Sequence, residues 1–228
     1  MISELVQQMV EAGVHFGHQS KKWHPRMKPY LLTQKGGIHI INVEETVKAV
    51  DKAGDFLQKL AARGGKILFV GCKRQAQDAV REAAEATGQY YVNFRWLGGM
   101  LTNYETIRKS IQRLSDLENI SKSEDFKKMS KKELASLNRE REKLTRNLQG
   151  IRNMDGLPDA VVVIDSDREK IAVAEARRLK IPVVAMVDTN ADPAAVQYPI
   201  PANDDAIRSI RLVLQQLVQP MIGLGSAA

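Results

Sequence analysis

The sequence predicts an α/β protein in which helices cover both faces of a five-stranded, doubly wound parallel sheet. Apolar runs of strand length alternate with amphipathic segments of helical length, and the runs are continuous and rich in β-branched residues. Continuous apolar runs are typical of strands that are buried on both faces, as in parallel sheets. The chain has 228 residues, of which 43% are hydrophobic, so it can form a substantial core.

The expected elements follow in chain order. A short amphipathic helix begins at the N-cap candidate Ser3 and ends at Gly13. The five expected strands are residues 37–42, 66–71, 89–93, 159–165 and 183–188. Apolar residues at three- and four-residue spacing predict further helices at 43–64, 72–88, 168–181 and 204–218.

The 65 residues between the third and fourth expected strands exceed what a crossover connection needs. Two apolar stripes run through them, formed by Tyr104, Ile107, Ile111, Leu114 and Leu117 and by Leu134, Leu137, Leu144, Leu148 and Ile151. Each stripe is narrow and flanked by charged residues, as in a two-stranded antiparallel coil, whereas a helix pair lying flat on the sheet needs a wider apolar face. The sequence therefore predicts a projecting coiled-coil helical hairpin at 104–153, inserted into an α/β domain formed by 1–103 and 154–228.

Positive charge is unevenly distributed along the chain. The net charge is +7, with +3 in residues 1–43, +2 in 44–104, +5 in 105–154 and −3 in 155–228. Cationic segments combined with an acidic end suggest that one side of the molecule faces a polyanion. Nucleic acid is the first candidate for that partner.

The cysteine content and the hydrophobic pattern bear on the cellular compartment of the protein. Its single cysteine excludes a disulfide framework and suits a reducing environment. It lacks an apolar run of the roughly 18 residues that a membrane helix needs, and it lacks a signal-peptide pattern. These features predict a soluble, intracellular protein.

In doubly wound folds, ligands bind at the carboxyl ends of the strands. Lys73 and Arg74 follow the second expected strand at the start of a helix, where free N–H groups favour a phosphate. Glycine spacing for a dinucleotide loop and the Walker signature are both missing there. The two side chains are candidates for contact with RNA phosphate, with a mononucleotide site or plain surface cations as the alternatives.

Arg95 and Trp96 end the third expected strand, just before Gly98 and Gly99. Such a pair can stack on bases or clamp phosphates, which makes both residues candidates for RNA binding. Trp96 can equally fill the core with Arg95 above it, and the sequence does not separate these two interpretations.

Three aspartates near the C-terminal end, Asp188, Asp204 and Asp205, follow the fifth expected strand or precede the last helix. Carboxylates cap helix N-termini, and they also bind hard cations such as Mg²⁺. A divalent cation on these three residues is the less favoured interpretation, and no other cofactor is expected. Because the sequence shows no catalytic triad, acid–base pair or cofactor motif, it predicts that the protein is not an enzyme.

Several long stretches together resemble one family. They are GVHFGHQSKKWHPRMKPY, FVGCKRQA, RWLGGMLTN, LPDAVVVID and IPVVAMVDTNADP followed by IPANDDAIRSI. In order and spacing they are similar to the bacterial-type family of the second protein of the small ribosomal subunit, over nearly the whole chain. Two positions differ from the usual family pattern: Cys72 stands where Thr is usual, and His24-Pro25-Arg26 stands where Asn-Pro-Lys is common.

The resemblance implies a flavodoxin-like fold that carries a coiled-coil hairpin, and a structural role on the cytoplasmic or an organellar ribosome. It implies binding to small-subunit ribosomal RNA and to neighbouring small-subunit proteins. These include the large OB-fold-repeat protein that captures mRNA. It implies neither a membrane nor a small-molecule substrate. A nucleotide- or phosphosugar-binding α/β enzyme is the alternative that the residues leave open.

The segment before residue 36 is the most unusual part of the sequence. Residues 12–43 contain no acidic residue, and residues 13–35 show neither helical nor strand periodicity. A basic, irregular loop within residues 1–35 can follow a folded RNA surface, since RNA is recognised largely through shape, backbone and stacking. We expect phosphate contacts from Lys21, Lys22, Arg26 and Lys28, and stacking of Trp23 on a base or sugar.

Overall fold

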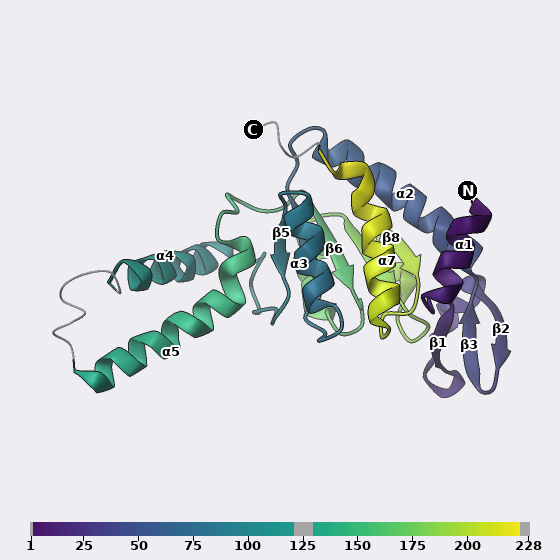
Figure 1. Cartoon of the computed structure of the whole chain (residues 1–228), viewed down its shortest axis with the longest axis horizontal. Coiled ribbons are helices and arrows are strands. Elements are labelled where there is room, and N and C mark those ends of the chain that lie inside the picture. The colour runs from purple at the N-terminus through teal and green to yellow at the C-terminus, as the bar shows by residue number, and fades with distance from the viewer. Residues whose placement is uncertain (1, 121–129, 224–228) are drawn as a thin grey trace.

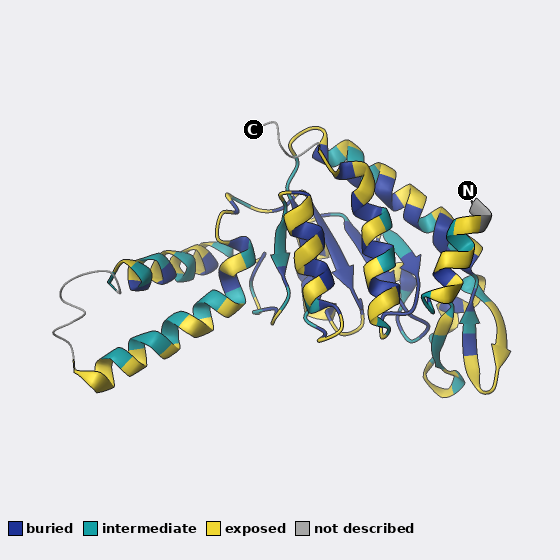
Figure 2. Cartoon of the chain, in the orientation of Figure 1, coloured by how far each residue is buried: buried dark blue, intermediate teal, exposed yellow. Residues whose placement is uncertain are grey.

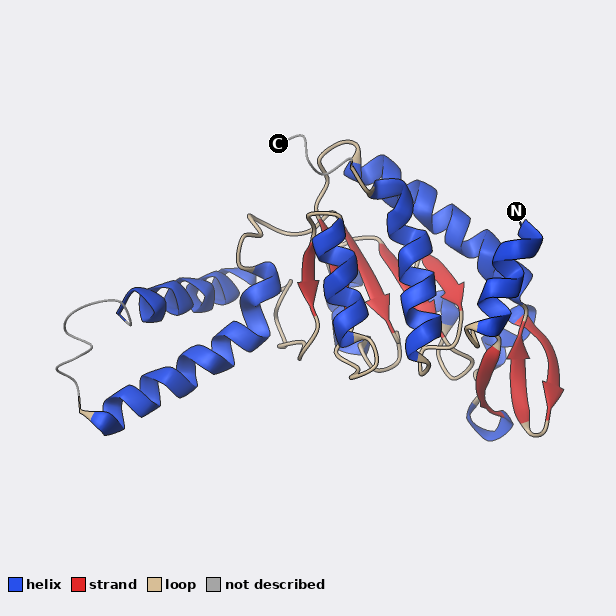
Figure 3. Ribbon diagram, viewed as in Figure 1, coloured by secondary structure: helices blue, strands red, loops and turns tan. Residues whose placement is uncertain are grey.

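The computed structural model describes residues 2–120 and 130–223 and confirms the α/β class. Its central sheet has five strands, all paired in parallel (Figure 3). In spatial order they are β5 (Tyr90–Val92), β4 (Ile67–Val70), β6 (Ala160–Ile164), β7 (Val183–Val187) and β8 (Tyr198–Pro201). Numbered along the chain, this order is 2-1-3-4-5, which is the flavodoxin-like arrangement.

Helices cover both faces of the sheet. On the face turned to the viewer in Figure 1 lie α3 (Gln77–Ala86) and α7 (Ile207–Val218), with α1 (Ile2–Glu11) and α2 (Val43–Ala61) beside them. The opposite face is covered by α6 (Lys170–Arg178). Every residue of β4, β6 and β7 is buried, which explains why these strands read as continuous apolar runs (Figure 2).

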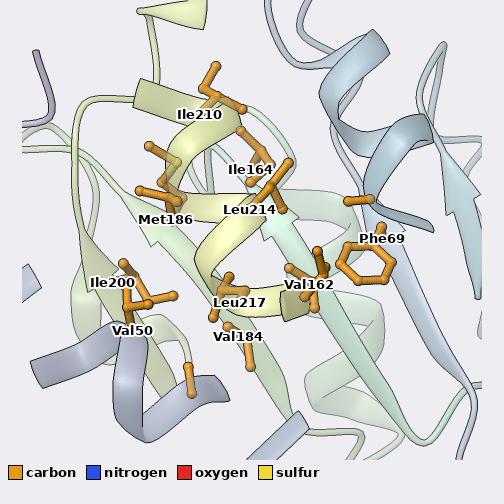
Figure 4. Packing of buried hydrophobic residues seen from close by; sticks show 14 of the residues in the cluster. Val50, Phe69, Val162, Ile164, Val184, Met186, Ile200, Ile210, Leu214 and Leu217 are labelled. Carbon is orange, nitrogen blue, oxygen red and sulfur yellow. The ribbon is translucent and has the colours of Figure 1, made fainter. Parts of the chain in front are cut away.

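The core on the α7 side joins helices to strands directly. Leu214 and Leu217 of α7 pack among Phe69, Val162 and Val184 of the sheet (Figure 4). Each of these side chains is at most 1% exposed, and burying an apolar side chain of this size contributes about 1.5–3 kcal/mol. This contact fixes the positions of the strand ends from which the candidate site is built.

One expected strand of the central sheet lies elsewhere. Residues 37–42 form β3 (Ile38–Ile41), which pairs antiparallel with β1 (Phe16–Gln19) and β2 (Leu31–Lys35) in a separate three-stranded sheet. Burial alternates along β3, with His39 and Ile41 buried and Ile38 and Ile40 more accessible. That pattern is typical of a half-buried antiparallel strand, so the assignment of 37–42 to the parallel sheet was wrong.

The fifth strand of the central sheet is β8, which the sequence did not indicate. Its sequence is Tyr-Pro-Ile-Pro, and prolines cannot donate to a strand ladder. β8 pairs only with β7 and therefore lies at the edge of the sheet, where proline is tolerated.

Residues 13–35, called the basic segment below, are also more ordered than their sequence indicates. Besides β1 and β2 they contain the 3₁₀ turns η1 (Ser20–Lys22) and η2 (Pro25–Tyr30). Pro25 occupies the first position of η2, where its missing N–H costs nothing. The remaining 3₁₀ turns described are η4 (Gln149–Ile151), η5 (Pro193–Ala195) and η6 (Gln219–Met221).

Two long helices, α4 (Tyr104–Ile120) and α5 (Lys131–Leu148), lie side by side and project away from the β5 end of the sheet (Figure 1). Arg113 donates two 3.0 Å hydrogen bonds to the Glu140 carboxylate across the pair. At their base, Ile107 and Leu148 are buried in the core on the α6 side of the sheet. The two helices are therefore observed, whereas their supercoiling and the division into domains stay predictions.

Deleting residues 112–143 and joining the ends with a short Gly/Ser linker should leave a folded α/β core. Ile111 and Leu144, the outermost residues of α4 and α5 that pack against the core, are kept in this variant. Thermal unfolding followed by circular dichroism should remain a single cooperative transition. A broad, uncooperative transition would show that the projecting helices belong to the core.

Candidate nucleic-acid interface

The basic segment lies across the carboxyl end of β7 and is held there by one residue. Thr189 is fully buried, and its hydroxyl oxygen accepts a 2.8 Å hydrogen bond from the backbone N–H of His18. Its carbonyl oxygen accepts a 2.7 Å hydrogen bond from the backbone N–H of His24. The two contacts flank η1, so Lys21 and Lys22 lie on a short arc that is fixed at both ends.

Only glycine fits where the segment meets Thr189. A Cβ atom added at Gly17 would lie 2.4 Å from Cγ2 and 2.8 Å from Oγ1 of Thr189, and 3.1 Å from the carbonyl oxygen of His39. These separations are below van der Waals contact. Gly17 is therefore needed for the close approach of β1 to the sheet.

His18 connects the segment to two aspartates. Its Nδ1 lies 3.1 Å from Oδ1 of Asp188, and its Nε2 lies 3.5 Å from Oδ2 of Asp205. The hydrogen bond with Asp188 raises the pKa of His18 above its ordinary value, although partial burial acts against this. A protonated imidazole donates from both nitrogens, so protonation strengthens both contacts.

Lys73 lies at the centre of a cluster of carboxylates. Its Nζ is 3.2 Å from Oδ2 of Asp165, 2.7 Å from Oδ1 of Asp204 and 2.6 Å from Oδ1 of Asp205. Lys73 follows β4 and Asp165 follows β6, so their ion pair occupies the point where the strand order reverses. In this fold that point is the usual ligand crevice. Asp165 has a φ of 68°, an unfavourable backbone conformation that persists where its surroundings enforce it.

The ionisable groups of the cluster differ in how far their pKa values are shifted. Burial and the charges of Asp165 and Asp188 raise the pKa of Asp204 to about 7. Lys73 lowers the pKa of the more exposed Asp205 by a direct hydrogen bond. The bonds to Asp204 and Asp205 raise the pKa of Lys73 above its ordinary value, although burial acts in the opposite direction.

This geometry bears on two of the expected contacts. Lys73 is only 8% exposed and is surrounded by carboxylates, so it is not free to contact RNA phosphate; Arg74, by contrast, is exposed. Asp204 and Asp205 bind the Lys73 ammonium, and Asp188 binds His18. Within residues 2–120 and 130–223, no group of three or more His, Cys, Asp or Glu side chains is arranged to hold a metal ion.

Trp96 belongs to the core and not to an exposed stacking surface. It is 8% exposed, and its Nε1 donates a 3.1 Å hydrogen bond to Oε1 of Glu175 in α6. The same carboxylate accepts four more hydrogen bonds, from the backbone N–H groups of Gly99, Leu101 and Thr102 and from the Thr102 hydroxyl. Burial opposes ionisation of Glu175, but these donors hold its pKa below the ordinary value. Arg95 remains exposed.

The other candidate RNA contacts lie on the surface. Lys21, Lys22 and Lys28 are exposed, and none of them forms a salt bridge with any described residue. Arg26 is also exposed, but its Nη1 lies 2.7 Å from Oδ2 of Asp192. Trp23 is half-buried, with its ring 5.0 Å from that of His39. The basic segment therefore presents three unpaired lysines, one paired arginine and part of a tryptophan ring.

Three residues that organise this region were not identified from the sequence. Thr189 and Gly17 are next to Asp188 and His18, but neither carries a charge that would mark it as a site residue. Glu175 lies in an amphipathic helix, where a single acidic residue carries no signal of its own. Their roles arise from contacts between segments that are far apart in the chain.

Gly17→Ala should lower the free energy of unfolding by about 1–3 kcal/mol, because the added methyl group overlaps Thr189. Urea denaturation measures this change. Gly98→Ala is the matched control, since a Cβ at Gly98 meets no atom within 4 Å. A Gly17→Ala protein as stable as the control would contradict the close contact.

The contribution of His18 to stability should depend on pH. Its pKa is raised in the folded state, so the contribution is complete below its unfolded pKa of 6.5 and is lost as the pH rises through the folded value. His18→Gln should therefore cost about 1.5–3 kcal/mol near pH 6, the scale of a hydrogen bond to a charged group. The cost should shrink toward pH 8.5 in denaturation series. A cost independent of pH would rule out a charged His18.

The family comparison agrees with this architecture. The family model described as ribosomal protein S2 matches residues 9–223, which include the basic segment, the central sheet and the two projecting helices. Among the described helices, none is both long and apolar enough to span a membrane. The match covers almost the entire chain, and we conclude that this protein belongs to the ribosomal protein S2 family and is a structural protein of the small ribosomal subunit.

Proposed function

We propose that the chain binds small-subunit ribosomal RNA through the exposed face of its basic segment, and so helps to build the small subunit of a cytoplasmic ribosome. The observation that supports this most strongly is the set of three unpaired lysines, Lys21, Lys22 and Lys28, on a segment fixed by Thr189. Phosphate contacts supply most of the affinity of proteins for nucleic acid.

The fixed shape of the segment favours binding. Two hydrogen bonds to Thr189 and the restricted backbones of Pro25 and Pro29 reduce the conformational freedom that RNA binding would otherwise remove. Arg26 and its partner Asp192 lie at the edge of the same surface. Trp23 offers the exposed part of its ring for stacking on a base or sugar.

The enzyme alternative has little support. At the strand-order reversal, the Lys73 ammonium lies within 3.2 Å of three carboxylates and is not available to a phosphate ligand. Burial raises the pKa of the Cys72 thiol to about 12, so the thiol is protonated at neutral pH and is a poor nucleophile. We therefore infer a binding role for this chain, with no catalysis and no resident cation.

Recruitment of the large OB-fold-repeat protein is the second part of the proposal. Val10, Phe16 and Ile207 are 44%, 49% and 54% exposed and line a hollow of about 730 Å³ beside the basic segment. Clustered exposed apolar side chains are typical of protein–protein contacts. This surface is therefore our candidate for contact with a neighbouring protein of the subunit.

Changing Lys21, Lys22 and Lys28 together to Ala should weaken binding to a small-subunit ribosomal RNA transcript and flatten its salt dependence. Each lost phosphate contact should lower the slope of log K against log salt by roughly 0.7–0.9. Changing Lys52, Lys59 and Arg63, which are exposed in and just after α2, is the matched control. The proposal fails if the two triple variants have the same slope.

Phe16→Ser should reduce retention of the OB-fold-repeat protein on assembled small subunits by about tenfold or more, since losing a buried aromatic contact costs about 1.5–3 kcal/mol. Ile222→Ser, at a residue 58% exposed and outside this hollow, serves as the control. Sedimentation followed by quantitative immunoblotting measures retention. Equal retention in the two variants would move the protein contact to another surface.

A further inference from the structure

The outer face of α6 is strongly basic. Lys170, Arg177 and Arg178 are exposed along it, and Arg168 and Lys180 are exposed at its two ends. None of these five side chains forms a salt bridge with any residue of the described parts of the chain. Asp167 is the one exposed acidic residue between 167 and 180.

The sequence gives no sign of this basic surface, because residues 155–228 carry a net charge of −3. Half of their ten acidic residues are buried: Asp165, Glu169, Glu175, Asp188 and Asp204. All seven Lys and Arg residues of the same range are exposed. On the surface of this range, the seven cations therefore outnumber the five accessible carboxylates, although the net charge of the range is negative.

One part of the basic segment, η2, packs on the same side of the central sheet as α6. Met27 of η2 is buried in one apolar cluster with Ala172, Val173 and Ala176 of α6. Helices α2, α3 and α7 pack in the other cluster, on the opposite side. Lys28 of η2 and the cations of α6 thus belong to elements on the same side of the sheet, although 139 residues lie between η2 and α6 in the chain.

The shape of the α6 face suits a nucleic-acid backbone. A shallow hollow of about 500 Å³ is lined by Thr102, Ile171, Ala174 and the buried, hydrogen-bonded Glu175, and is bordered by the cations Lys170 and Arg178. The minor groove of double-stranded RNA is wide and shallow and displays riboses between two rows of phosphates. Small and apolar residues between cations match that arrangement, with the cations placed toward phosphate.

We propose that the outer face of α6 is a second RNA contact, which binds the phosphate backbone of a double-stranded segment of the same ribosomal RNA. This inference rests on the proposed function, since it assigns a further surface to the same partner. It places this second contact on the side of the sheet opposite α2, α3 and α7.

The test compares three triple variants of the full chain on one probe, a transcript of small-subunit ribosomal RNA, over a series of KCl concentrations. The variants change Lys170, Arg177 and Arg178 on α6, Lys21, Lys22 and Lys28 on the basic segment, and Lys52, Lys59 and Arg63 on the α2 side, each to Gln. All nine side chains are exposed, so circular dichroism spectra and melting temperatures should match those of the wild type.

We expect the α6 variant to lower the slope of log K against log salt by roughly 2–3, which corresponds to three phosphate contacts, while the α2 variant matches the wild type. An α6 variant with the wild-type slope and affinity overturns the inference. If the basic-segment variant nevertheless binds the transcript more weakly than the wild type, the proposed function stands without the α6 contact. If the wild type itself binds the transcript without salt dependence, the proposed function fails as well.

Discussion

The contact between Thr189 and the basic segment is the constraint on which the proposed RNA surface depends. Through its hydroxyl and its carbonyl oxygen, Thr189 binds the amides of His18 and His24, and Gly17 provides the space for this approach. The strands β1 and β2 lie near the two ends of the segment and pair with β3 in the small antiparallel sheet. Without this attachment, the lysines would lie on a free loop whose ordering on RNA would oppose binding.

The electrostatics of the carboxyl edge follow from the same attachment. Asp188 and Asp205 bind His18, and Asp165, Asp204 and Asp205 bind Lys73. An edge that serves as a ligand crevice in many proteins of this architecture is here an internal joint between the sheet and the N-terminal segment. Because three of its four aspartates are buried, this joint adds little negative charge to the surface.

The sequence predicted the parts of the fold that depend on local patterns. Strands β4, β5, β6 and β7 were found from their apolar runs, whereas β8 was missed because its prolines mimic a loop, and β3 was placed in the wrong sheet. Lys21 and Lys22 are exposed, as a contact with RNA requires, and their role in RNA binding stays a prediction. Lys73 was expected at the surface and Trp96 was left between two interpretations, because their partners, three aspartates and Glu175, come from distant segments. Long-range contacts of this kind leave no periodic pattern in the sequence.

Native-state amide hydrogen exchange tests the attachment of the basic segment most directly. If Thr189 holds the segment to the sheet, the amides of His18 and His24 should exchange slowly, with opening free energies close to those of the β7 amides. Exchange of both amides at the rate of an unfolded peptide, while β7 remains protected, would contradict the account. The segment would then be a free loop, and its order would have to come from RNA.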